Sequence, residues 1–193
     1  MQKLTLADIK DVREYERERE EFRARIIEMK KRRRVPLGDI ITLTFENTDT
    51  MRFQVQEMAR VERIITDEAI EHEVETYNQL IPDDGELSAT LFIEINDKAG
   101  LMEWLPKLVG IQRAVQFDLG AAGVVAPVPQ NEDFLTREEV TASVHYVKFP
   151  FSGEQAQALR DGPAALVADH EHYQVRVDLD EPVRHELASD LGL

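Results

Sequence analysis

The spacing of hydrophobic residues changes along the chain, and this change restricts the fold more than any other feature of the sequence. In residues 9–29 and 51–77 they recur mostly every three, four or seven positions, a spacing typical of helices with one apolar face. From residue 87 onward, several short runs alternate hydrophobic and polar residues, as strands with one buried face do. The sequence therefore predicts an α+β fold with a helix-rich N-terminal half, a long first helix, and a largely antiparallel sheet formed mainly by the C-terminal half.

The expected elements can be placed by residue range. Val35-Pro36 is expected to stop the first helix, and Asp180, Pro182 and Gly192 are expected to cap the last one. Helices are predicted at about 5–33, 51–65, 66–81, 98–108, 152–159 and 180–192. Strands are predicted at 40–45, 87–95, 115–119, 124–126, 140–146, 164–168 and 173–179, with hairpins at 115–126 and 164–179.

Charge divides the chain into two unequal parts. Residues 1–34 contain 12 of the 23 Lys and Arg residues and 8 of the 38 Asp and Glu residues, so this segment carries +4 and the remaining 159 residues carry −19. We therefore expect residues 1–34 to form a long, basic-ended helix packed on the body or on a second subunit. Residues 35–193 are expected to form a single α+β domain.

Composition excludes several classes of protein. With no cysteine, the chain has no disulfides, thiolate zinc sites, iron–sulfur ligands or cysteine nucleophiles. No apolar run approaches the roughly 20 residues that span a bilayer, and Met1–Asp8 lacks the apolar stretch of a signal peptide, so a soluble cytoplasmic protein without membrane contact is expected.

The basic run Lys30–Arg34 resembles a phosphate-binding patch. Five cations at a helix C-terminus also complement the helix dipole, and the acidic body repels nucleic acid. We therefore expect self-association or an acidic protein partner rather than nucleic acid.

Two further groups of residues could bind a metal. Asp169-His170-Glu171-His172 places imidazoles and carboxylates in a predicted hairpin turn, where an exposed polar turn is the simpler interpretation. In the second helix, Glu57 and Glu62 fall inside the apolar arc at about 100° per residue. A carboxylate buried there needs an arginine, a backbone amide or a metal as its partner.

His145 falls among the outward residues of its strand, with Thr141 and Ser143, which predicts that it faces solvent, a second layer or a cleft. With His170 and Glu57 or Glu62 it would complete a two-histidine, one-carboxylate set, the arrangement that non-haem iron uses. The metal candidates are therefore His145, His170, Glu57 and Glu62.

Four segments together resemble a family of bacterial proteins known only as a domain of unknown function. They are Gln54–Glu62, Tyr77–Pro82, Ser143–Tyr146, and Asp169-His170 with Tyr173, and the resemblance covers essentially the whole chain. Genes of this family often lie beside genes for rubrerythrin-like proteins and iron–sulfur oxidoreductases. The resemblance thus implies a redox or oxidative-stress setting and favours iron or manganese as the metal. The family pattern D-H-x-x-Y makes His170 a better candidate than His172.

These observations leave three functions open. The first is a metal-binding accessory protein, with iron or manganese, in a redox or oxidative-stress system. The second is a non-catalytic interaction or oligomerisation protein that docks through its N-terminal helix. The third is a small-molecule enzyme in which a buried glutamate, Glu57, acts as a base.

Overall fold

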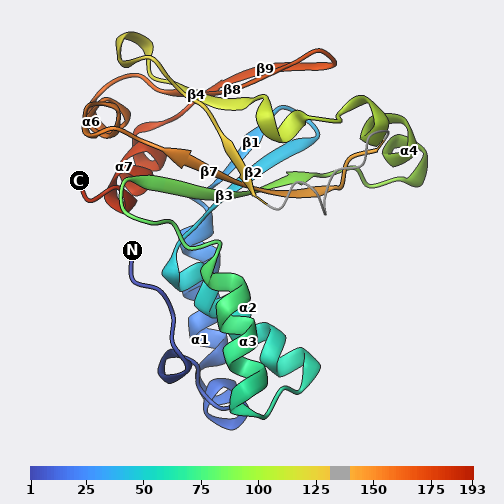
Figure 1. Ribbon diagram of the computed structural model, residues 1–193, viewed down its shortest axis with the longest axis vertical. Helices are drawn as coiled ribbons and strands as arrows, with labels where there is room; N and C mark the ends of the chain where they lie inside the picture. Colours follow the sequence, from blue (N-terminus) through green and yellow to red (C-terminus); the bar gives the residue numbers. More distant parts are fainter. Residues whose placement is uncertain (131–139) are drawn as a thin grey trace.

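The computed structural model describes residues 1–130 and 140–193 and confirms the α+β class. Two antiparallel sheets lie above a group of three helices (Figure 1). Among the described residues, no helix has both the length and the apolar composition that a membrane span requires.

The first sheet has five strands, and the chain builds it from both halves of the sequence. Its order is β1 (Arg34–Leu37), β2 (Ile41–Glu46), β3 (Glu86–Ile93), β7 (Val144–Pro150) and β6 (Val128–Gln130). The second sheet has the order β5 (Val124–Val125), β4 (Val115–Asp118), β8 (Ala165–His170) and β9 (Tyr173–Asp178). The expected hairpins β4–β5 and β8–β9 are confirmed.

The main core lies between the inner faces of the two sheets. Phe117 of the second sheet packs against Phe45 and Phe149 of the first, with ring centroids 5.7 and 5.0 Å apart. The remaining helices are α4 (Lys98–Lys107), α6 (Gly153–Asp161) and α7 (Glu181–Asp190), with 3-10 turns at Leu6–Asp8, Ile111–Arg113 and Gly120–Ala122. Asp180 caps α7 by accepting from the Val183 amide, as the sequence predicts.

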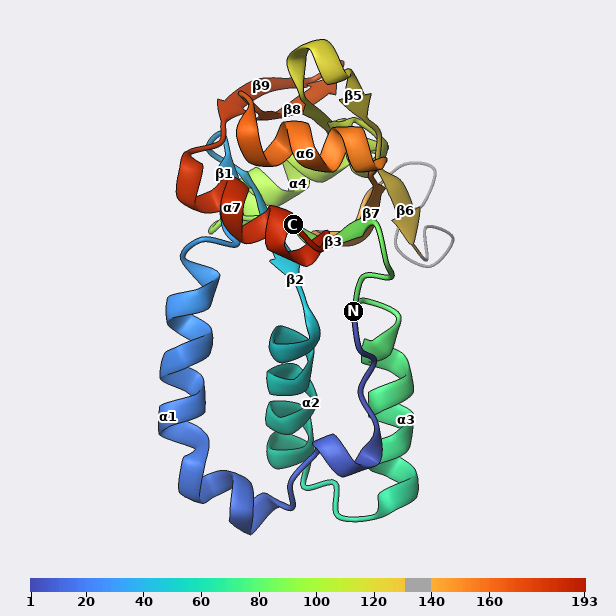
Figure 2. The same cartoon turned by 90° about the vertical axis from the view of Figure 1, so that its left-hand side faces the viewer.

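The other three helices form what we call the helical arm, which consists of α1 (Val12–Lys30), α2 (Thr48–Glu62), α3 (Asp67–Asn78) and the segment 1–11. The arm extends away from the sheets (Figure 2). It has apolar clusters of its own, separate from the sheet core, and Phe22 of α1 packs edge-on against Phe53 of α2 with centroids 5.6 Å apart. The long first helix therefore packs against α2 of the same chain.

Both ends of the first helix differ from the prediction. Thr5 and Asp8 form the expected capping box, but the turn they cap is the 3-10 turn, and α1 begins at Val12 because Asp11 caps it. At its other end α1 stops at Lys30, and residues 34–37 form the edge strand β1. Pro36 fits there because an edge strand does not need every backbone amide.

Candidate functional site

The four predicted metal ligands lie on different parts of the fold. Glu57 and Glu62 belong to α2 in the arm, His145 to β7, and His170 to the end of β8. Within residues 1–130 and 140–193, no group of three or more His, Asp or Glu side chains is arranged to hold a metal ion. The structure therefore does not bring the predicted set together.

Glu57 joins α2 to α1. Its Oε1 accepts from the Tyr15 hydroxyl at 2.6 Å and from Arg19 Nε at 2.8 Å, and its Oε2 accepts from a second Arg19 nitrogen at 2.9 Å. Hydrogen bonds from Arg19 hold the pKa of Glu57 below its ordinary value, although partial burial opposes the shift. Both carboxylate oxygens are thus occupied, and the arginine partner is one of the alternatives that the sequence left open.

The prediction that Glu62 lies within the buried arc is wrong. Glu62 is exposed, and so is Val61, which is 67% exposed. The apolar arc spans residues 51–65, but α2 ends at Glu62, and Arg63 then takes a left-handed conformation that ends the helical periodicity. Helical angles alone do not show where that contact ends.

A second residue of the same motif, Gln56, holds the start of the chain in place. Its Oε1 accepts from the Lys10 amide at 2.8 Å, and its Nε2 donates to the Lys10 carbonyl at 3.1 Å. Asn78 makes the same two-point contact with Leu4, with distances of 2.8 and 2.9 Å. Two of the segments that carry the family resemblance therefore bind backbone of the segment 1–11.

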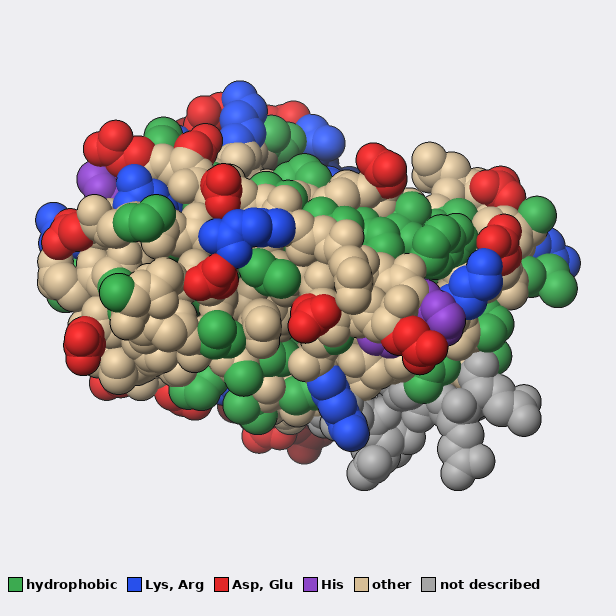
Figure 3. All heavy atoms as spheres, turned by 90° about the horizontal axis from the view of Figure 1, so that it is seen from above, with side chains coloured by type: hydrophobic (Ala, Val, Ile, Leu, Met, Phe, Trp, Pro, Cys, Tyr) green, Lys and Arg blue, Asp and Glu red, His purple; other side chains and the backbone are tan. Residues whose placement is uncertain are grey.

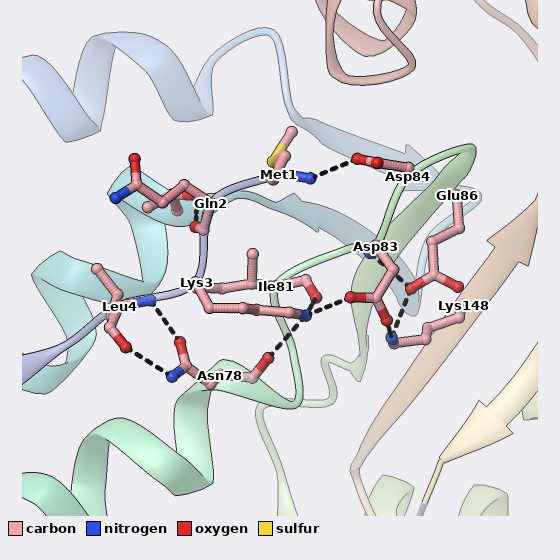
Figure 4. A network of polar contacts seen from close by, with 11 residues as sticks. Met1, Gln2, Lys3, Leu4, Asn78, Ile81, Asp83, Asp84, Glu86 and Lys148 are labelled. Carbon is pink, nitrogen blue, oxygen red and sulfur yellow. Dashed lines mark hydrogen bonds and ion pairs between the residues drawn. The ribbon is translucent and has the colours of Figure 1, made fainter.

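Figure 4 shows the Asn78 contact within a larger network. The Lys3 ammonium donates to the carbonyls of Asn78 and Ile81, at 3.2 and 2.6 Å, and lies 2.9 Å from Asp83. Lys148 of β7 also lies close to Asp83, at 3.3 Å. The network thus connects the segment 1–11 to the sheet through the loop that follows α3.

His145 lies on the inner face of its strand rather than on the outward face that the sequence indicates, so among the expected surroundings it meets a second layer of the fold and not solvent. It is 1% exposed and lies on the inner face of β7 with Val147 and Phe149. Its Nε2 lies 2.8 Å from the Thr141 hydroxyl and 3.0 Å from the Ala142 carbonyl. The alternation of residues from Val140 onward indicates that His145 points outward. The strand begins at Val144 and runs to Pro150, and within it the residues that point inward are the opposite ones.

His170 closes the β8–β9 turn. Its Nε2 lies 3.0 Å from the Val109 carbonyl, and its Nδ1 accepts from the His172 amide at 3.2 Å. Both ring nitrogens therefore have hydrogen-bond partners within the chain, whereas His172 is exposed. Figure 3 shows the molecule from above, and on this face histidine side chains lie beside acidic ones while hydrophobic side chains gather in a patch. A metal role for these residues stays a prediction.

The basic run after α1 is largely neutralised within the chain. Arg33 is 2% exposed and forms a bidentate pair with Asp190 at 2.6 and 2.7 Å, and it also donates to Glu186 at 2.9 Å. Arg32 donates to the other oxygen of Glu186 at 3.0 Å. These contacts join the turn that follows α1 to α7, and they leave two fewer cations for a phosphate ligand.

Glu46 is a buried carboxylate that the sequence did not single out. It is 5% exposed, and its Oε1 accepts from the Thr90 hydroxyl at 2.8 Å, while its Oε2 has no hydrogen-bond partner among the described residues. Alternation along β2 puts Glu46 on the outer face of the sheet, opposite Phe45, where exposure would be expected. The end of the arm nearest the sheets covers that face, since Tyr146 on the same face packs against the apolar cluster that contains Met51 and Val55. No local sequence signal reveals this.

Hydrophobic side chains are exposed at the end of the arm that is farthest from the sheets. Ile65 is 82% exposed and Val61 is 67% exposed. Two hollows lie beside them, of about 500 Å³ and 540 Å³, and Ile65 and Val12 line both. Arg63, between the two exposed residues, ends α2 in the left-handed conformation with φ of 55°. This surface, with Ile65 as a ridge between hollows, is the candidate functional site.

Comparison with known proteins gives a family but no activity. The chain resembles a crystal structure of a protein of unknown function from Burkholderia pseudomallei, with a TM-score of 0.91 and 32% sequence identity over 98% of this chain and 100% of that one. Comparison with curated protein sequences gave no match. The model of a protein family of unknown function, DUF3501, matches residues 3–191. The chain therefore belongs to the DUF3501 family.

Proposed function

We propose that this protein is a non-catalytic interaction protein that assembles with a second copy of itself through the end of the helical arm. The observation that carries the proposal is the exposure of Ile65, an isoleucine that is 82% exposed between two hollows. Covering such a side chain contributes on the order of 2 kcal/mol. A single exposed side chain is ordinary, but here a neighbouring valine and two hollows accompany it.

The shape of the surface fits a second copy. In a two-fold interface the same surface must supply both the projecting and the receiving parts. Ile65 and Val61 project here, and the hollow beside them is lined by Leu6, Ile9, Ala59 and other apolar residues. In a pair of arms related by a two-fold axis, the projecting side chains of each copy can therefore enter the hollow of the other copy.

The charge of the surface supports the same partner. The chain as a whole carries −15, which opposes association of two copies through most of their surface. The lining of the two hollows is almost neutral, with four cations and three carboxylates: Lys10, Arg13, Arg60, Arg63, Asp11, Glu16 and Asp67. Two arms can approach each other there without the repulsion that the acidic sheets would produce.

Sedimentation velocity over a wide range of protein concentration tests this proposal. We expect the unmodified protein to form a dimer and Ile65→Asp to shift it to the monomer, because the substitution would bury two carboxylates against apolar hollows. Met102→Asp is the matched control, since Met102 is 70% exposed on α4, outside the arm.

Circular dichroism should show that both variants are folded. A monomer at every concentration for the unmodified protein would refute the proposal. A dimer that survives Ile65→Asp would refute it as well.

A further inference from the structure

A third hollow, of about 580 Å³, lies between the C-terminal end of α1 and the outer face of β1, β2 and β3. Its volume is in the range of ordinary small-molecule sites. Ile27 and Phe92 contribute apolar surface to the hollow, and the Ile27 side chain is 49% exposed. We call this space the α1–sheet hollow.

The α1–sheet hollow already holds a carboxylate that belongs to the chain. Glu94 accepts from Arg34 at 2.5 Å through one oxygen and from the Thr42 hydroxyl at 2.6 Å through the other. These hydrogen bonds keep the pKa of Glu94 below its ordinary value. The Glu94 side chain is still 43% exposed, so the Arg34–Glu94 pair at the polar end of the hollow stays within reach of solvent.

Two lysines add positive charge on the helix side. Lys30 and Lys31 both line the hollow, and Lys31 also pairs with Glu28 at 2.6 Å, whereas no ion pair is described for Lys30 in the part of the chain covered by the structure. With Arg34, the lining holds three cations and one carboxylate, Glu94. A chain of net charge −15 thus presents a locally positive, partly apolar hollow.

We propose that the α1–sheet hollow binds a small organic anion, an acidic group on an aromatic or aliphatic body. The apolar body would contact Ile27 and Phe92, and the acidic group would lie between the lysines and Arg34. Fixed cations beside apolar surface hold an anion better than either feature alone, because water is displaced from the apolar side while the charge stays paired. The proposal does not depend on self-association, since the hollow lies at the opposite end of α1 from the arm's exposed end.

The probe for this site is 1-anilinonaphthalene-8-sulfonate, an aromatic anion whose fluorescence rises on binding. Its matched neutral probe is N-phenyl-1-naphthylamine, which has the same rings and no sulfonate. We expect saturable one-to-one binding of the anion, and binding of the neutral probe that is at least tenfold weaker. Equal affinity for the two probes would overturn the proposal, because it would mean that apolar surface alone is responsible.

Two substitutions should act in opposite directions on the affinity for the anionic probe. Lys30→Glu together with Lys31→Glu should weaken binding at least tenfold, because repulsion replaces attraction at short range. Glu94→Gln should strengthen it several-fold, since it removes the carboxylate that competes for Arg34. Lys98→Glu together with Lys107→Glu is the control for net charge, because both are exposed cations on α4 and the pair changes the charge by the same amount.

Ile65→Asp separates this site from the end of the arm, where the probe could also bind. Under the proposal, that variant keeps the probe affinity of the unmodified protein even if it becomes monomeric. The absence of saturable binding would overturn the proposal. So would an affinity that the lysine substitutions leave unchanged or that Ile65→Asp abolishes.

Discussion

Replacing Gln56 with methionine tests whether the resemblance motif on α2 serves the fold. Gln56 is 3% exposed and binds both polar groups of the Lys10 backbone. Methionine has nearly the same length and shape, so Gln56→Met removes the two hydrogen bonds and leaves packing almost unchanged. Gln54→Met is the matched control, because Gln54 lies two residues earlier on α2 and no hydrogen bond of its side chain is described in the structure.

The magnitude follows from the two contacts. Each hydrogen bond contributes about 1 kcal/mol net, and a buried backbone group left without a partner costs about 1–3 kcal/mol. Lys10 is only half-buried, so water can replace part of what is lost. We therefore expect Gln56→Met to lower the free energy of unfolding by about 2 kcal/mol and Gln54→Met to change it by less than about 0.5 kcal/mol.

Urea unfolding followed by circular dichroism measures both values, and amide hydrogen exchange locates the change. Exchange should become faster for residues 4–12 of the Gln56 variant, because their anchor on α2 is lost. Equal free energies of unfolding for the two variants would refute the reasoning. Unchanged exchange in this segment would show that the contact does not hold it.

Three further predictions concern local features of the fold, and urea unfolding checks each of them. Gly38→Ala should destabilise the protein more than Gly110→Ala, although both glycines have a positive φ. A Cβ atom at residue 38 would lie 2.3 Å from the Tyr173 hydroxyl oxygen. None of the described atoms lies within 4 Å of a Cβ atom at residue 110. Arg63→Gly should stabilise the protein by about 0.5–1 kcal/mol, since φ of 55° is costly for arginine. The pKa of Glu57 is lower in the folded protein than its ordinary value of 4.5, so ionised Glu57 stabilises the fold above that value. This stabilisation is lost as the pH falls through the pKa of Glu57 in the folded protein. Glu57→Gln should therefore flatten the acid side of the pH–stability curve.

The fold was predictable where one physical signal dominates. The antiparallel hairpins β4–β5 and β8–β9 follow from alternation and turn residues, and the start of α7 follows from its Asp180 cap. The edge strand β1 was missed because Pro36 favours the end of an element and gives no sign of a new one. β1 pairs with β2 in a local hairpin closed at residues 38–40, where Gly38 has a positive φ, but a run of four residues is too short to be recognised as a strand by alternation.

The candidate site was less predictable because burial depends on distant segments. Helical angles place Glu57 and Glu62 within one broad apolar arc of α2, yet Arg19 of α1 pairs only with Glu57, and Glu62 is exposed. A shift of the strand boundary reversed the orientation of His145. The exposure of Ile65 was hidden for the same reason, since an isoleucine that continues an apolar arc is normally buried.

The segments that carry the family resemblance and the surfaces proposed for binding are largely different parts of the molecule. Gln56 and Asn78 bind the backbone of the segment 1–11, and Tyr173 donates to the Leu37 carbonyl at 2.6 Å, so each connects elements far apart in the sequence. A fold retained with a TM-score of 0.91 at 32% identity requires only a minority of residues to specify it, and long-range contacts of this kind suit that role. Val61 belongs to one of these segments, whereas Ile65, in the connection between α2 and α3, and Lys30, at the end of α1, lie outside them. Substitutions there should therefore change binding while leaving the fold intact, which is the opposite of what Gln56→Met should do.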